Sequence, residues 1–220
     1  MKFYLFLFLC LYGPMFTVLG QPQLANDNPK LNKALQAELI KMGREDQRYR
    51  TKWQNQMIKM SPTERSKPNK VDALMKKQEQ VDRRNVLRLA EIVQQHGWPD
   101  RSLVGEAASG AAFLIVQHAK LEQQEKYLPL IKASAIKGEV NPANAATLED
   151  RVLVGQRKKQ RYGTQVHFGP ETGGKWELYA IEDEEHVDER RAAVGMEPLA
   201  KYLKEFGIEY QPPGRPCKDR

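Results

Sequence analysis

Residues 97–119 read GWPDRSLVGEAASGAAFLIVQHA, and this stretch decides the fold. A breaker of glycine, tryptophan and proline opens it, and a helix is predicted to follow at residues 103–119. Five residues of this helix share one face at helical spacing: Val104, Ala108, Ala111, Ile115 and His118. Apolar or small residues also fill the other faces. We therefore expect a buried central helix, with the remaining helices packed around it.

The chain on both sides of this stretch also shows helical periodicity. Further helices are predicted at residues 31–59, 71–95, 143–158, 187–194 and 198–206. Between residues 120 and 138 the pattern is helical too, although Pro129 should restart or kink a helix there. Two β-prone runs around a glycine-rich turn predict a hairpin near residues 164–181. The expected fold is therefore mainly α, a single domain at residues 31–209 of about six helices with one small hairpin.

The first twenty residues stand apart from the rest of the chain. Lys2 precedes the apolar run Phe3–Tyr12, and small residues come before Gln21, as in a signal peptide at residues 1–20. The run is too short to span a bilayer, so no stable membrane span is expected after cleavage. A buried N-terminal helix or an uncleaved anchor are the alternatives. We expect an exported protein, periplasmic or secreted.

Composition narrows the possible partners. A polar linker is expected at residues 21–30 and a disordered, proline-rich tail at residues 210–220. The net charge is +7, but basic and acidic residues are mixed along the chain. The one dense basic run, residues 157–161, is followed by a single aromatic residue, so no nucleic-acid partner is expected. The partner is instead an unknown small ligand or a protein.

Most motifs that carry known chemistry are absent. The sequence has no phosphate-binding glycine loop, no nucleophile elbow and no zinc or redox motif, and we expect no cofactor. His118 and Glu122 share the spacing of two metal ligands, but no third ligand accompanies them, so no metal site is predicted. Of the two cysteines, Cys10 would leave with the signal peptide. Cys217 alone cannot form an internal disulfide.

Three predicted helices carry an ionisable group on the line of their apolar stripe, namely Asp46, Asp82 and His118. Burying a charge without a partner is unfavourable. These groups should therefore meet each other, meet a cation such as Arg50 or Arg151, or line a cleft. A histidine with nearby carboxylates suits general acid–base chemistry. In that case His118 carries the proton, Asp46 or Asp82 orients it, and one of the arginines holds an anionic or carbonyl group.

A second candidate lies where helix gives way to strand, at residues 162–165, read YGTQ. A glycine between an aromatic residue and two hydrogen-bonding side chains is a common place for a backbone to approach a ligand. The alternative is a plain helix-to-strand turn.

Together these residues resemble an uncharacterised bacterial family that is known only as a domain of unknown function. The motifs that carry the resemblance are Asp46-Gln47 with Arg50, Asp82 with Asn85, Gly97-Trp98-Pro99 followed by Val104-Gly105, Gln117-His118-Ala119, Asp150-Arg151 and Tyr162-Gly163-Thr164-Gln165. The resemblance extends from about Leu35 to Leu203. It implies a bacterial origin and one mostly helical domain, and it implies no reaction.

The resemblance also groups the polar positions into one expected pocket. Its catalytic candidates are His118, Asp46 and Asp82. Its ligand-binding candidates are Gln47, Arg50, Asn85, Trp98, Gln117, Asp150, Arg151, Tyr162, Gly163, Thr164 and Gln165. The predicted function is that of an exported bacterial protein whose pocket suits hydrolase-like acid–base chemistry or small-ligand binding. The alternative is a non-catalytic binding or structural module, in which the same residues form a buried network.

Overall fold

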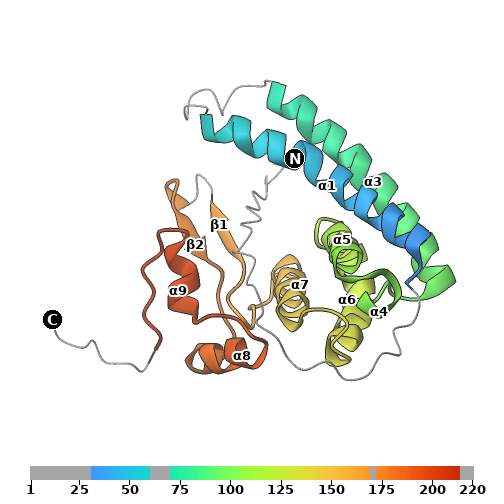
Figure 1. The fold of residues 1–220 in the computed structure, drawn as a ribbon. Coiled ribbons are helices and arrows are strands. Elements are labelled where there is room, and N and C mark those ends of the chain that lie inside the picture. Colours follow the sequence, from blue (N-terminus) through green and yellow to red (C-terminus); the bar gives the residue numbers. More distant parts are fainter. Residues whose placement is uncertain (1–30, 60–69, 169–171, 214–220) are drawn as a thin grey trace. The chain divides into compact units, whose positions relative to one another are not determined.

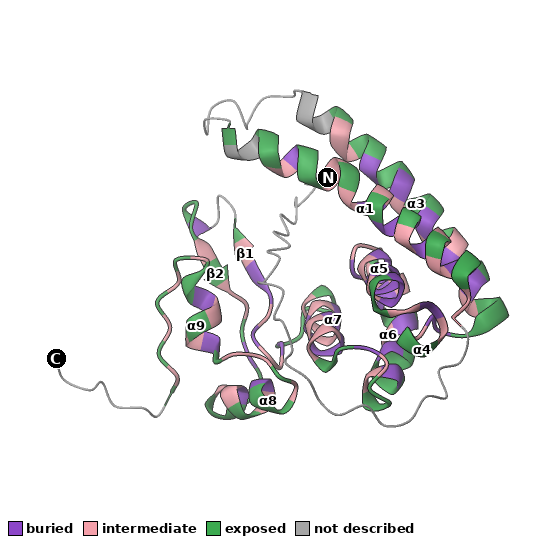
Figure 2. Cartoon of the chain, viewed as in Figure 1, coloured by how far each residue is buried: buried purple, intermediate pink, exposed green. Residues whose placement is uncertain are grey.

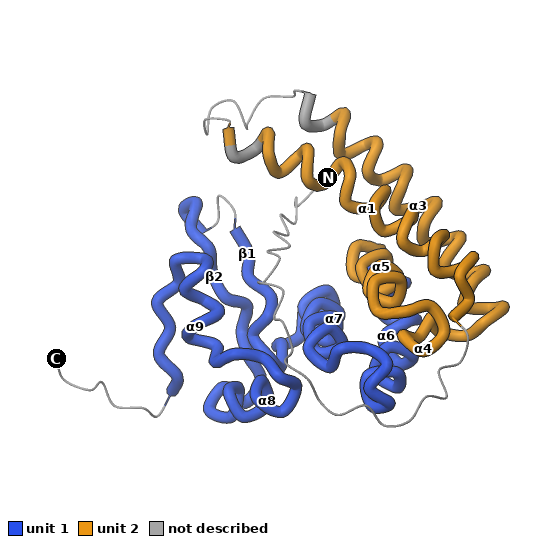
Figure 3. Tube along the Cα trace, in the orientation of Figure 1, with its two compact units in different colours: residues 1–7, 120–220 blue, residues 8–119 orange. Residues whose placement is uncertain are grey.

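The computed structural model describes residues 31–59, 70–168 and 172–213 (Figure 1). Over these ranges the chain is mainly helical and carries one small antiparallel hairpin, which confirms the expected fold class. The chain divides between Ala119 and Lys120 into two compact units (Figure 3). We keep the names of that figure: unit 2 ends at Ala119, and unit 1 contains the chain from Lys120 onward.

Two long helices frame unit 2. Helix α1 spans Lys33–Lys59 and helix α3 spans Lys70–His96, and the two pack against each other and against α5. Their apolar stripes supply the contact, as the helical spacing predicts. The fully buried side chains on these stripes are Leu39, Leu89 and Ile92. Gly97 follows α3 with a φ of 73°, a conformation that glycine adopts readily at the end of a helix.

The expected central helix at residues 103–119 is divided in the structure. A short helix, α4, spans Arg101–Val104, and α5 spans Glu106–Gln117. Gly105 separates them with a φ of 82°, which lies outside the helical region. A Cβ at this position would lie 2.7 Å from the Gln36 side chain, so the break also lets α1 approach closely. Sequence periodicity continues across Gly105 and therefore did not reveal the break.

Helix α5 is buried over most of its length, as expected for the centre of a packed unit (Figure 2). Its small residues let α1 come near, because a Cβ added at Gly43 of α1 would lie 2.7 Å from the Ala111 Cβ of α5. The larger side chains Phe113, Ile115 and Val116 of the same helix are also buried. The small-residue run of α5 is thus a packing surface for α1.

Unit 1 begins with two helices that pack together, α6 at Leu121–Ile136 and α7 at Pro142–Gly155. Helix α6 continues through Pro129, so no restart occurs there. Pro129 and Glu125, whose carbonyl loses its partner, are both exposed, and water can replace the missing hydrogen bond. The Asn141 side chain caps α7 by accepting a hydrogen bond from the Ala143 amide.

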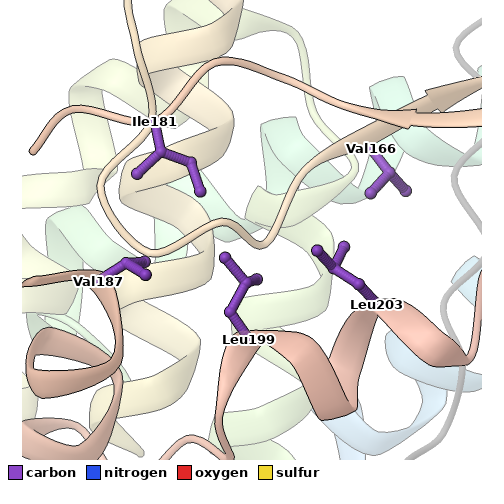
Figure 4. Packing of buried hydrophobic residues seen from close by; sticks show 5 residues of the cluster. All are labelled: Val166, Ile181, Val187, Leu199 and Leu203. Atoms are coloured by element: carbon purple, nitrogen blue, oxygen red, sulfur yellow. The ribbon is translucent and has the colours of Figure 1, made fainter. Parts of the chain in front are cut away.

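The rest of unit 1 is built from short elements. The hairpin pairs β1, Val166–Phe168, with β2, Trp176–Leu178, and a 3₁₀ turn, η2, spans Glu184–His186. Helices α8, Val187–Ala193, and α9, Leu199–Lys204, follow it. Their apolar side chains meet those of the hairpin region in one buried cluster (Figure 4): Val166, Ile181, Val187, Leu199 and Leu203.

Several expectations fall on parts of the chain outside the described residues. These are the signal peptide at residues 1–20, the linker at 21–30, Cys217 and most of the tail at 210–220. The single domain at residues 31–209 stays a prediction. In the part of the chain that the structure describes, no helix has the length and apolarity that a membrane crossing requires.

The contact between α1 and α5 gives a stability prediction. Gly43→Ala should lower the free energy of unfolding by about 1–3 kcal/mol, because the new methyl group collides with Ala111. Gly110→Ala on α5 is the matched control, since a Cβ there meets no atom within 4 Å. This control should gain about 0.5–1 kcal/mol from helix propensity. Urea unfolding of both variants measures the difference, and equal effects would contradict the close packing.

Candidate functional site

The first polar cluster lies within unit 2 and joins α1 to the end of α5. His118 is the first residue after α5, and its Nδ1 lies 2.8 Å from Asp46 Oδ2. Both side chains are almost fully buried, with 4% of His118 and 1% of Asp46 exposed. Asp46 is on the buried face of α1, one turn after Met42, as the stripe analysis predicted. The structure therefore brings two of the three catalytic candidates into direct contact.

Asp46 is also approached by two other side chains of α1. Gln47 Nε2 donates to Asp46 Oδ2 over 2.7 Å. Arg50 Nε lies 3.7 Å from the same oxygen, which is an ion-pair distance and too long for a hydrogen bond. One carboxylate oxygen thus gathers an imidazole, an amide and a guanidinium. These donors and the cation compensate the burial of the Asp46 charge.

The third candidate, Asp82, pairs with Arg50, whose Nη2 donates to Asp82 Oδ2 over 2.6 Å. On the same helix, α3, Gln78 donates from Nε2 to Asp82 Oδ1 over 2.7 Å. Arg50 and Asp82 are each 22% exposed, so this end of the cluster reaches solvent. Neither contact of Arg50 engages Nη1, which retains two N–H donors. Sequence reasoning missed Gln78, although it lies one helical turn before Asp82.

The electrostatics of the cluster follow from burial. Burial raises the pKa of Asp82 above its usual 3.8, and this effect exceeds the opposing effects of the Arg50 charge and the Gln78 hydrogen bond. The negative charge of Asp46 raises the Asp82 pKa further. Because the pKa is higher in the folded state, ionisation of Asp82 as the pH rises lowers the stability of the fold.

Three other ligand-binding candidates are buried in unit 2. Asn85 of α3 donates to the Met42 carbonyl of α1 over 3.2 Å, and it thereby ties the two long helices together. Trp98 is 7% exposed and Gln117 8%. The Asn85 contact supports a structural role for that residue.

The second polar cluster lies within unit 1 and is centred on Asp150 of α7, which is fully buried. Its carboxylate accepts hydrogen bonds from the backbone amides of Arg161, Tyr162 and Thr164 at 2.7–3.2 Å. The Thr164 hydroxyl donates to it as well, over 2.9 Å. Burial raises the Asp150 pKa above 3.8, although these hydrogen bonds act in the opposite direction. Asp150 therefore fixes the conformation of residues 161–164. We call residues 161–165 the Asp150 loop.

Other side chains hold the carbonyl groups of this loop. Arg190 donates to the Arg161 carbonyl, Arg191 to the Tyr162 carbonyl and Tyr202 to the Thr164 carbonyl, at 2.7–3.0 Å. Arg191 is 2% exposed and its guanidinium also lies 5.1 Å from the centre of the Tyr202 ring. Burial raises the pKa of Tyr202 to about 12, so its hydroxyl stays a donor.

Gln160 completes the attachment of the loop. Its Nε2 donates to the carbonyls of Gln165 and Tyr179, and its Oε1 accepts from the Gln165 amide. Sequence reasoning missed Gln160, Arg190, Arg191 and Tyr202. Gln160, Arg190 and Arg191 lie in runs of polar residues, where nothing in the spacing separates a buried side chain from an exposed one. Tyr202 lies on the apolar stripe of the helix predicted at residues 198–206, where its spacing indicates packing and gives no sign of a polar role.

Gly163 has a φ of 71°, and a Cβ there would lie 2.7 Å from a Leu199 methyl carbon, so both conformation and space favour glycine. Arg151 is half-buried on α7, next to Asp150. The sequence-predicted residues thus form two groups, one in each unit. The single pocket expected from the sequence stays a prediction.

Within residues 31–59, 70–168 and 172–213, no group of three or more histidine, cysteine, aspartate or glutamate side chains is placed to hold a metal ion. A second histidine–aspartate pair is present in unit 1, where His186 Nδ1 lies 2.8 Å from Asp183 Oδ1. Here both side chains are more than half exposed. The two pairs have the same 2.8 Å distance between Nδ1 and the carboxylate oxygen, and they differ in burial.

These features define a class: a mainly helical protein in which each unit contains a buried carboxylate surrounded by polar partners. More particularly, the chain belongs to the family of unknown function DUF6624, whose model matches residues 33–211. The family resemblance expected from the sequence is thereby confirmed, and the match spans both units. Comparisons with curated proteins and with solved structures found no match.

The charges around Asp82 give a prediction for its titration. In carbon-detected NMR of the full chain, the Asp82 carboxyl should titrate above pH 3.8, whereas Asp183 should titrate below it. The pKa of Asp183 is lowered because its carboxylate accepts a hydrogen bond from His186 and lies beside the positive charge of the protonated imidazole. Arg50→Met should raise the Asp82 pKa further, since it removes the neighbouring positive charge. An unchanged Asp82 midpoint in this variant would contradict the Arg50–Asp82 pair.

The Asp150 loop gives a stability prediction. Asp150→Asn should lower the free energy of unfolding by about 3 kcal/mol, because one carboxylate oxygen that accepts backbone amides becomes an NH2 group. Thr164→Val removes only the hydroxyl contact and should lower it by about 1 kcal/mol. Thermal and urea unfolding of both variants measure this order. Equal losses would show that the backbone amides contribute little.

Proposed function

We propose that the cluster of unit 2 is a general acid–base centre for the hydrolysis of a small substrate, with His118 as the proton carrier. The single observation that carries this proposal is the buried Asp46–His118 hydrogen bond of 2.8 Å. A carboxylate on one imidazole nitrogen fixes the ring and its tautomer. In the neutral ring Nδ1 then holds the proton and Nε2 the lone pair, so Nε2 is the base.

The reaction follows from this assignment. His118 Nε2 takes a proton from water as the water oxygen attacks a carbonyl or phosphoryl centre of the substrate. The bond to the leaving group then breaks, and the imidazolium returns its proton to that group. Asp46 stabilises the imidazolium between these two steps without taking the proton.

Arg50 is the group that would bind the substrate oxygen on which negative charge develops. Its Nη1 donors are outside both ion pairs, and 22% of the side chain is exposed. Asp82 and Gln78 act as positioning residues, because they hold Arg50 through a chain of hydrogen bonds of 2.6 and 2.7 Å. A guanidinium held in place stabilises an oxyanion without having to reorganise during the reaction.

The competing interpretation is a structural network in a non-catalytic binding module. It is favoured by one observation, the 1% exposure of Asp46 together with its contacts to Gln47 and His118. Removing one partner of such a network destabilises the fold strongly, because a buried charge is left unpaired. Acid–base catalysis and network stability are therefore separable by comparing rate with stability in the same variants.

We further propose that the protein works outside the cytoplasm of a bacterium and that it acts on a small ligand. The support is the signal-like sequence of residues 1–20, in which a lysine precedes an apolar run. Hydrolysis suits such a location because it needs only water as the second reactant. Detection of a mature N-terminus near Gln21 after expression in a bacterium, by mass spectrometry of the secreted or periplasmic fraction, tests this part.

His118→Gln should lower hydrolysis by about 100-fold or more, because the base is lost while a polar side chain of similar size remains. The measurement is kcat/KM on chromogenic carboxylic esters and phosphate monoesters, together with the melting temperature of the full chain. His186→Gln is the matched control, since it removes an exposed histidine with the same 2.8 Å contact to aspartate. This control should change neither the rate nor the melting temperature.

Two results would refute the acid–base assignment. One is a His118→Gln variant that hydrolyses these substrates at the wild-type rate. The other is a large loss of melting temperature in His118→Gln that matches the loss in Asp46→Asn, with no hydrolysis by the wild type. The second result would establish the structural network instead.

A further inference from the structure

We propose that the solvent-facing side of helix α1 is a docking surface for an anionic lipid membrane. The surface is formed by four cations, which we call the α1 basic stripe: Lys41, Arg44, Arg48 and Lys52. All four residues are exposed. The stripe includes no residue of the acid–base centre, so the proposal stands independently of the proposed reaction.

The stripe is continuous because its cations follow one another at helical spacing. They are three or four residues apart on one uninterrupted helix. At about 100° per residue, their directions fall within an arc of about 80° on the helix surface. A rise of 1.5 Å per residue spreads their Cα atoms over about 16 Å along the helix axis. The buried residues Leu39, Met42 and Asp46 lie on the opposite side of the helix.

Folding separates charges that are mixed along the sequence of α1. Besides the buried Asp46, this helix has two acidic residues, and both pair with α3. Glu38 Oε1 lies 2.6 Å from Arg88 Nε. Glu45 Oε2 lies 2.6 Å from Arg84 Nη2. Among the residues that the structure describes, the stripe cations form no ion pair with a carboxylate, so their positive charge is directed to solvent.

The shape of the stripe selects a membrane as its partner. A site for one small anion needs donors that converge, whereas these cations are spread along a line over several helical turns. A membrane presents its anionic headgroups in a plane, which a straight helix can contact along its length. Each lysine or arginine near such a surface adds to the attraction without needing a fixed position. The charge of the stripe is therefore complementary to an anionic lipid surface.

The aromatic residue beside the stripe also suits a membrane. Arg48 Cζ and Lys52 Nζ lie 5.5 and 6.0 Å from the centre of the Tyr49 ring. Tyrosine has an apolar ring and a polar hydroxyl, a combination that is enriched at the level of lipid headgroups. Sites for single-stranded nucleic acid instead interleave cations with several aromatic rings, on which successive bases stack. Tyr49 is the one aromatic residue in residues 33–52.

The test measures binding of the full chain to sedimenting vesicles of two compositions. One set contains equal parts of phosphatidylglycerol and phosphatidylcholine, and the other contains phosphatidylcholine alone. The ratio of the two partition coefficients reports the electrostatic contribution, because an apolar contact with lipid contributes to both. At low ionic strength four cations should raise this ratio to about 100 or more, and about 0.5 M salt should bring it close to one. A ratio close to one at low ionic strength would overturn the proposal.

Arg44→Gln combined with Arg48→Gln should lower the ratio about 25-fold, because each cation near the surface contributes a factor of about five. Lys126→Gln combined with Lys137→Gln is the matched control, since it removes the same charge from exposed positions of unit 1. The control should change the ratio by less than about twofold. Melting temperature and circular dichroism report whether both variants fold. Equal losses in the two double variants would show a response to net charge alone and would overturn the proposal.

A DNA duplex of random sequence serves as the competing partner, because its phosphates also attract cations. Fluorescence anisotropy of the labelled duplex measures this binding at the same ionic strength. Duplex binding that Arg44→Gln with Arg48→Gln abolishes, together with no binding of the wild type to the anionic vesicles, would assign the stripe to nucleic acid. That result would also overturn the proposal.

Discussion

The burial of two carboxylates, Asp46 and Asp150, constrains both units of this protein. A carboxylate removed from water must meet donors or cations, or it will take up a proton instead. Unit 2 meets this requirement with side chains from helices, and His118, Gln47 and Arg50 converge on one oxygen of Asp46. Unit 1 meets it with the backbone of an irregular loop, whose amides turn toward Asp150.

The two solutions have different consequences for chemistry. Side chains around Asp46 retain groups that can act on another molecule, because an imidazole and a guanidinium each have more than one functional nitrogen. Backbone amides around Asp150 are used up by the carboxylate, so the loop gains a fixed shape. The proposed acid–base role uses the first arrangement, whereas the second fixes the conformation of residues 161–164. The His186–Asp183 pair has the same 2.8 Å distance as the His118–Asp46 pair, but it is exposed. Burial therefore distinguishes the two histidine–aspartate pairs, and distance does not.

Much of the helical fold could be predicted from spacing alone. Apolar periodicity located α1 and α3 to within one or two residues, and turn residues located the hairpin. The break at Gly105 could not be predicted in the same way, since an isolated glycine is also tolerated inside a helical pattern. A Cβ at this position would meet the Gln36 side chain, so the constraint comes from a residue far away in sequence.

The candidate sites were predictable in part for the same reason. A charged residue on an apolar stripe identified Asp46 and His118 as groups that need partners, but only packing decides that they partner each other. Arg191 illustrates the limit, because it follows Arg190 directly. In the structure the Arg191 side chain is buried, whereas Arg190 is partly exposed and donates to the carbonyls of Arg161 and Glu182. Neighbouring arginines in a charged run carry no signal that separates these two roles.

The Gln160 side chain has a consequence for how this chain can vary in evolution. Its side-chain NH2 donates to the carbonyls of Gln165 and Tyr179, and its side-chain oxygen accepts from the Gln165 N–H. The side-chain amide therefore makes the hydrogen bonds that a peptide unit of a neighbouring strand would make. A side chain of fixed length thus sets the span between residues 160 and 165. Insertion or deletion of a residue within this span would displace Gln165 from that amide. Related chains should therefore differ here by substitution and keep the number of residues constant.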